Sequence, residues 1–234
     1  MHVILCHPDD AAALWLHGAL VALGLPTVEL VAVEQLVYAR RIVHRIDGAG
    51  DRSVIDLFDG RRLDSATIEG LVNRIRFLPQ QHLTRVAASD QSYAVDELRG
   101  WLLAWLDSLP CPVINQPRPQ SLGGLWHHPA TVAHLAAVSG LPCGDGSEDP
   151  EASRSAVVVF EGKVFGPILP RARQEAACRL AALLGASALQ VDFEQGGKTG
   201  WRFVGANGMA DFRIGGRPLA AAVAARLVES GGAA

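Results

Sequence analysis

Short apolar segments alternate with helical patterns from residue 1 to about residue 140, and this alternation constrains the fold more than any other feature. His2–Cys6 has the length and composition of a buried strand, and Ala11–Leu23 predicts a helix that ends at Gly24. A second strand is expected at Val28–Val33 and a central one within Ile68–Phe77. Strands that alternate with helices usually form a parallel sheet covered by helices, so we expect an α/β domain.

The same stretch predicts four further elements. They are a hairpin in which Ser53–Leu57 precedes the turn at Asp59-Gly60, a helix over Asp90–Leu109, a short strand at Pro112–Asn115, and a helix over Thr131–Val138.

The remaining residues predict a smaller α+β lobe. Hairpins are expected at Val157–Phe165 and at Ala188–Phe193 with Trp201–Asn207, and helices at Arg171–Leu184 and Pro218–Val228. Polar turn formers fill the segment between Leu-Pro and the first hairpin. We therefore expect an N-terminal α/β domain over residues 1–142, a linker over 143–156 and a C-terminal lobe over 157–230.

Composition limits the classes of function. The net charge of −3 and the lack of a basic run disfavour nucleic-acid partners, and charges interrupt every apolar stretch before it reaches the length of a membrane span. The start of the chain lacks the features of a signal peptide, and the four cysteines have no paired CxxC spacing. These features predict a cytoplasmic protein with no membrane or nucleic-acid partner.

The order of motifs resembles the ATP-grasp ligases, and within them the peptide-modifying, RimK-like type. Asp192 opens the C-terminal hairpin and Asn207 closes it, as an Asp and an Asn do at the metal-binding end of that family. Arg74 and Arg76 at a strand end, followed by Asn115-Gln116-Pro117, are similar to the family's N-terminal domain. The resemblance implies an α/β domain of the pre-ATP-grasp kind followed by an ATP-grasp lobe, with ATP and magnesium as cofactors.

The chain departs from the family where the family handles ATP. Gly205 stands where the resemblance calls for a magnesium-bridging Glu, and Trp126-His127-His128-Pro129 replaces the lysine expected for the nucleotide phosphates. Only thirteen residues, Cys143–Ser155, occupy the place of the family's lid. We therefore expect a truncated, degenerate form with no catalytic residues and no cofactor, in which Asp192 and Asn207 are remnants of a metal site. The alternative is that Asp192 caps a turn and that Asn207 takes a left-handed bend.

Four polar residues are candidates for binding a ligand: Arg74, Arg76, Asn115 and Arg118. They lie at predicted strand ends or in the loop that follows, where α/β folds bind ligands. Guanidinium groups hold carboxylates and phosphates through paired hydrogen bonds. These residues predict a site for a peptide or a small acidic metabolite.

A second resemblance is found at the other end of the chain. His7-Pro8-Asp9-Asp10 after the first strand is similar to zinc-dependent N-acetylglucosaminyl deacetylases, in which the His and the second Asp bind zinc and the first Asp is the general base. In the simpler interpretation Asp9 and Asp10 cap the helix that follows.

The sequence favours a non-catalytic binding or scaffold partner in a biosynthetic pathway that modifies a peptide or a small metabolite. A homodimer or a complex with another protein is expected. The alternatives are an active ATP-dependent carboxylate–amine ligase with an unusual nucleotide site and a zinc hydrolase that uses His7, Asp9 and Asp10.

Overall fold

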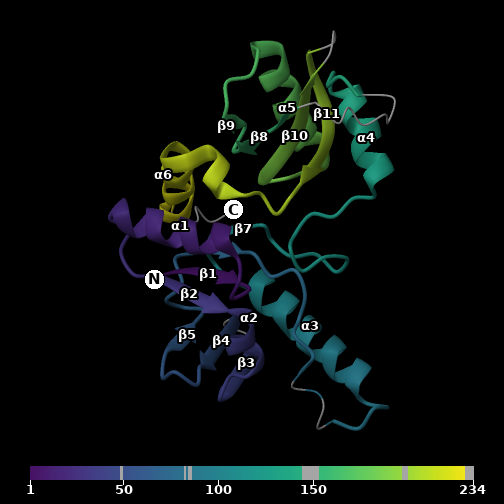
Figure 1. Ribbon diagram of the computed structural model, residues 1–234. Helices are drawn as coiled ribbons and strands as arrows, with labels where there is room; N and C mark the ends of the chain where they lie inside the picture. Colours follow the sequence, from purple (N-terminus) through teal and green to yellow (C-terminus); the bar gives the residue numbers. More distant parts are fainter. Residues whose placement is uncertain (48–49, 82, 84–85, 144–152, 197–199, 230–234) are drawn as a thin grey trace. The chain divides into compact units, whose positions relative to one another are not determined.

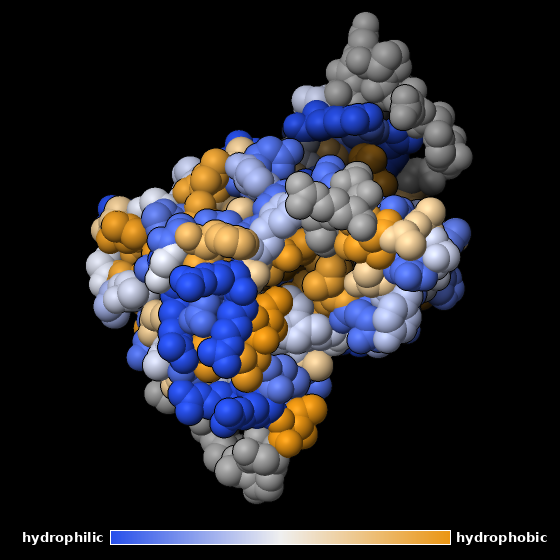
Figure 2. Space-filling view, turned by 90° about the horizontal axis from the view of Figure 1, so that it is seen from below, coloured by the Kyte–Doolittle hydropathy of each residue, from blue (hydrophilic) through white to orange (hydrophobic). Residues whose placement is uncertain are grey.

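A computed structural model describes residues 1–47, 50–81, 83, 86–143, 153–196 and 200–229 of the chain (Figure 1). The chain divides into two compact units, one formed by Met1–Gly124 together with the chain from Val223 on, the other by Leu125–Ala222. Apolar side chains on the face shown in Figure 2 are interspersed among hydrophilic ones. Within the described ranges, no helix has both the length and the apolarity needed to cross a membrane.

A four-stranded parallel sheet forms the centre of the first unit, in the order β2-β1-β6-β7. Its strands are β1 (His2–Cys6), β2 (Val28–Ala32), β6 (Gly70–Asn73) and β7 (Val113–Ile114). The helices of this unit are α1 (Ala11–Ala22), α2 (Val33–Val37) and α3 (Gln91–Asp107). Every residue of β1 and β6 is buried, as expected for inner strands of a parallel sheet that is covered on both faces.

A separate antiparallel sheet also belongs to the first unit. It consists of β3 (Arg41–Asp47), β4 (Gly50–Asp56) and β5 (Arg62–Asp64), in that order. The turn at Asp59-Gly60 is confirmed, with Gly60 at φ +87°. Strand β3 was not predicted, because arginine and histidine divide its apolar residues into the short groups Ile42-Val43 and Ile46 and leave no continuous apolar run.

The second unit contains an antiparallel sheet in the order β11-β10-β8-β9. Its strands are β8 (Ser153–Phe160), β9 (Lys163–Phe165), β10 (Ala188–Gly196) and β11 (Gly200–Asn207). The helices of this unit are α4 (Pro129–Val138), α5 (Arg171–Leu184), the 3₁₀ helix η3 (Phe212–Gly215) and the first part of α6 (Gly216–Val228), whose residues from Val223 on belong to the first unit. Alternate residues of the central strands, such as Val157, Val159, Val191 and Phe193, form the core together with one face of α5.

The predicted fold class is confirmed: the chain has a parallel sheet with helices and an additional α+β part with antiparallel strands. Of the predicted linker 143–156, residues 144–152 lie outside the described residues, and Ser153–Ala156 form the beginning of β8. The compact units have boundaries other than 142 and 157, and the domain ranges drawn from the sequence stay predictions.

Two glycines of the first unit give a matched test of packing. A Cβ added at Gly70 on β6 would lie 2.8 Å from the carbonyl oxygen of Leu227, whereas one added at Gly100 on α3 would meet nothing within 4 Å. We expect Gly70→Ala to destabilise the protein by about 1–3 kcal/mol, because backbone has to move. Gly100→Ala should instead stabilise it by roughly 0.5–1 kcal/mol, since alanine favours the helix. Urea unfolding measures both, and equal effects would contradict the packing argument.

Candidate functional site

The carboxyl edge of the parallel sheet is a candidate ligand-binding site. Strand β1 lies between β2 and β6, so the connections leave β1 in opposite directions and create a switch point between β1 and β6. Ligands of open α/β sheets bind outside the carboxyl ends of strands at such a point. The segments here are His7–Asp10 after β1 and Arg74–Phe77 after β6, with Asn115 following β7.

Asp10 and Arg74 form a buried ion pair at this edge. The Nε of Arg74 donates to Oδ2 of Asp10 at 2.8 Å, and Nη2 donates to Oδ1 at 3.2 Å. The same carboxylate accepts the backbone N–H groups of Ala12 and Ala13 and so caps α1, as the simpler interpretation of the sequence predicted. Burial acts to raise the pKa of Asp10, but the hydrogen bonds and charge of Arg74 outweigh it and hold that pKa below its usual value.

His7 contacts the segment that follows β6. Its Nε2 accepts the backbone N–H of Arg76 at 3.1 Å, and its ring stacks on Phe77 with 4.2 Å between centroids. Burial, and then the charge of Arg76, lower the pKa of His7, which favours the neutral imidazole. With the Nε2 lone pair of His7 and both oxygens of Asp10 engaged, this segment does not fit a zinc ion. In the described part of the chain no three His, Cys, Asp or Glu side chains are grouped so as to hold a metal.

The predicted ligand-binding residues separate into two kinds. Arg74 and Asn115 are buried, and Asn115, with φ +59°, exchanges hydrogen bonds with Asn73 across the ends of β6 and β7. Arg76 and Arg118 have exposed side chains on the segments that follow the same two strands. The first pair therefore builds the sheet edge, and ligand binding by the four residues stays a prediction.

The second unit presents a polar face on its antiparallel sheet. Asp192 lies in the middle of β10, directly opposite Gly205 on β11 and Ala156 on β8. A hollow of about 320 Å³ opens beside Asp192 and Phe193. Val204 has no partner in the register, so β11 bulges next to this position, and bulges are frequent beside functional sites.

Neither Asp192 nor Asn207 has the role that the turn interpretation gave it. Asp192 is a strand residue whose Oδ1 accepts a hydrogen bond from Nε2 of Gln190 at 2.7 Å. Asn207 ends β11 without a left-handed backbone, and its Oδ1 accepts the N–H of Met209 at 2.9 Å. Gln190 also accepts the N–H of Asp211, so its side chain links the strand to the bend before η3.

Glu194, which was not among the predicted site residues, lies two residues beyond Asp192 on the same face of β10. Its side chain is 5% exposed and forms ion pairs with Arg154 at 3.5 Å and with Arg202. Both partners are arginines on the neighbouring strands, in register with Glu194. Alternation along β10 would have revealed Glu194 as a companion of Asp192, but its arginine partners depend on strand pairing.

This arrangement does not fit a pair of magnesium ions. Magnesium takes oxygen ligands in octahedral geometry. Here the carboxylate of Glu194 is neutralised by two guanidinium groups, one oxygen of Asp192 is engaged by Gln190, and position 205 has no side chain. In place of the expected lysine, His128 caps α4 through Nδ1, which accepts the N–H of Ala130.

Comparison with known proteins identifies the fold. No family model and no curated protein matches the chain. Among solved structures, the macrocyclase MdnC of Microcystis aeruginosa MRC, bound with the precursor peptide MdnA, aligns over 98% of this chain and 100% of its own, with TM-score 0.74 and 13% identity. The chain has the ATP-grasp ligase fold. This confirms the family resemblance at the level of the fold.

Two further structures support the same conclusion. A RiPP-associated ATP-grasp ligase of Chryseobacterium gregarium, in complex with ADP and leader and core peptides, aligns with TM-score 0.71 and 10% identity over 97% of this chain and 96% of its own. The ATP-grasp ligase PsnB, with a minimal precursor, Mg and ADP, aligns with TM-score 0.67 and 15% identity over 97% and 98%. The elements therefore follow the same order nearly from end to end.

The Asp10–Arg74 pair gives a prediction on stability and pH. Asp10→Asn leaves the buried guanidinium without its counter-charge and should cost about 3 kcal/mol of unfolding free energy at pH 7. Because the pKa of Asp10 is lower in the folded protein, the stabilisation is present above the usual pKa of 3.8 and is lost as pH falls through the folded value. The stabilities of wild type and variant should converge in acid.

Asp9→Asn is the matched control, since Asp9 is exposed and adjacent. Its effect should stay within about 0.5 kcal/mol. Urea unfolding between pH 7 and pH 3 measures all three proteins. A gap between wild type and Asp10→Asn that persists unchanged at low pH would contradict the assignment.

Proposed function

We propose that this chain is a non-catalytic ATP-grasp-like protein that binds a peptide in a pathway of peptide modification. The observation that carries the proposal is Gly205 directly opposite Asp192, in a face where Glu194 is neutralised by Arg154 and Arg202. The fold of the ligases is kept while the oxygen ligands for magnesium are reduced to a single partly engaged carboxylate and an amide.

Phosphoryl transfer explains why these losses matter. The reaction needs little covalent chemistry from the protein and depends on magnesium and cationic groups that position and neutralise the phosphates. A side chain that neutralises magnesium's charge is missing at position 205, and Glu194 is held by arginines. A face of this kind supports a binding role better than activation of a carboxylate.

The solved structures with this fold suggest the class of partner. MdnC and PsnB were each determined with a precursor peptide. For this chain we propose a peptide as the bound partner, with Arg76 and Arg118 as exposed cationic groups at the carboxyl edge of the parallel sheet. We also propose that the chain assembles with a second copy of itself or with a catalytic ligase.

Binding of ATP tests the non-catalytic assignment directly. Isothermal titration of the protein with ATP in the presence of magnesium should give a Kd weaker than about 1 mM, an interaction free energy of less than roughly 4 kcal/mol. A magnesium-dependent Kd in the micromolar range would contradict the proposal and favour an active carboxylate–amine ligase.

Restoring a carboxylate at position 205 tests the proposed loss of magnesium ligands. A Cβ at Gly205 would meet nothing within 4 Å, so a side chain can begin there without a clash at Cβ. Gly205→Glu places a second carboxylate opposite Asp192, and the repulsion should lower stability by about 0.5 kcal/mol relative to Gly205→Gln. Magnesium at ten times its Kd should then stabilise the Glu variant by about 1.4 kcal/mol.

Thermal unfolding with and without magnesium measures both effects, and wild type and Gly205→Gln should not respond to the ion. Stabilisation of wild type by magnesium as large as that of the Glu variant would show that position 205 is not the missing ligand.

A further inference from the structure

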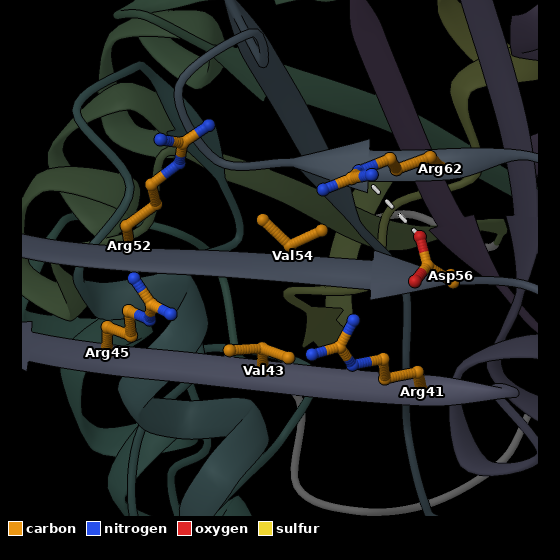
Figure 3. Close-up of a pocket in the computed structure, with 7 residues that line it drawn as sticks. All are labelled: Arg41, Val43, Arg45, Arg52, Val54, Asp56 and Arg62. Atoms are coloured by element: carbon orange, nitrogen blue, oxygen red, sulfur yellow. Dashed lines mark ion pairs between the residues drawn. The ribbon is translucent and has the colours of Figure 1, made fainter.

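The sheet β3-β4-β5 carries a concentration of arginine on its outer face. Four arginines, Arg41, Arg45, Arg52 and Arg62, surround a hollow of about 270 Å³, and we name this surface the arginine face (Figure 3). All four side chains are exposed. Val43 and Val54 lie between them and form an apolar floor.

Strand alternation explains how this face arises. Arg41, Val43 and Arg45 occupy alternate positions of β3, so their side chains share one face of the sheet. On the other face, Ile55 and Leu63 are buried in the core of the first unit. Burial of the opposite face therefore determines which side chains form the arginine face.

The register places like charges together on this face. Arg45 lies directly opposite Arg52, and like charges in that position destabilise a sheet. Arg52 is partly compensated by Asp64, at 2.7 and 3.2 Å, and Arg62 by Asp56 at 3.7 Å. Arg41 lies directly opposite Asp56, but within the described residues neither Arg41 nor Arg45 forms an ion pair. The face thus holds four positive and two negative groups in a chain whose net charge is −3.

The geometry points to an acidic peptide as the partner of the arginine face: we propose that an extended segment with the pattern acidic-x-apolar-x-acidic binds along β3. Arg41 and Arg45 are four residues apart, or about 13 Å along a strand. Two acidic side chains four residues apart on an extended peptide match that spacing, and an apolar residue midway meets Val43. Strand β3 is at the edge of its sheet, where a peptide strand adds by backbone hydrogen bonds.

A peptide fits this surface better than a nucleic acid. The carboxylates of Asp56 and Asp64 would repel a continuous phosphate backbone, and none of the residues that line the hollow is an aromatic on which a base stacks. The two valines, Val43 and Val54, instead favour a partner that carries an apolar side chain. The inference rests on the proposed function in one respect, that the partner is a peptide.

Fluorescence anisotropy tests the inference with a labelled peptide that contains Glu-Thr-Val-Thr-Glu and a matched peptide in which Gln replaces both Glu residues. The Glu peptide should bind wild type more tightly than the Gln peptide, and roughly tenfold more salt should weaken its binding because exposed charges are screened. Arg41→Gln with Arg45→Gln should weaken the Glu peptide by about fivefold or more. The control is Arg99→Gln with Arg217→Gln, which removes two exposed arginines elsewhere and should leave the affinity unchanged.

Unfolding temperature separates a binding role from a structural one. Removing Arg45 relieves its repulsion with Arg52, so the double variant should unfold no earlier than wild type. Three results would overturn the inference: equal binding of Glu and Gln peptides, unchanged affinity in the double variant, or tighter binding of a single-stranded oligonucleotide through Arg41 and Arg45. None of them bears on the magnesium and ATP measurements, which report on the second unit and test the proposed function separately.

Discussion

The buried ion pair between Asp10 and Arg74 joins two parts of the first unit that are distant in sequence. One carboxylate caps α1 and also holds the guanidinium that follows β6. The backbone of Arg76, two residues further on, is in turn fixed by His7. The contact thus positions both sides of the switch point between β1 and β6. Since both side chains are more than nine-tenths buried, removing either one would leave the other charge without its partner.

The polar face of the second unit shows that the pairing of its strands does not depend on the side chain at position 205. The backbone pairing that places position 205 opposite Asp192 depends on ladder hydrogen bonds and on the buried residues of β10, none of which needs a carboxylate. Glycine at position 205 therefore leaves the sheet intact. Under the proposed function this glycine is the lost magnesium ligand, while the charge of Glu194 is balanced by Arg154 and Arg202.

Strands and helices with strong patterns were predicted well. β1, α1, α5 and the C-terminal hairpin lie where apolar runs, caps and glycine turns placed them. Strand β3 was not predicted, since Arg41 and Arg45 on its outer face and His44 on its inner face interrupt the apolar residues, and only pairing with β4 makes it a strand. The roles of Arg74 and Asn115 were equally out of reach: both occupy the predicted edge of the sheet, but their buried partners, Asp10 and Asn73, come from segments distant in sequence.

The sequence by itself determined the fold class, the elements with strong patterns and the absence of a side chain at position 205, because these follow from local periodicity and from residue identity. The tertiary structure decided which charged side chains are neutralised by a partner and which are exposed on the surface. Glu194 and Asp10 are paired with arginines from other segments, whereas on β3 the register places Arg45 opposite Arg52 and Arg41 opposite Asp56. Electrostatic interactions depend on distance through space, and only strand register and burial set those distances.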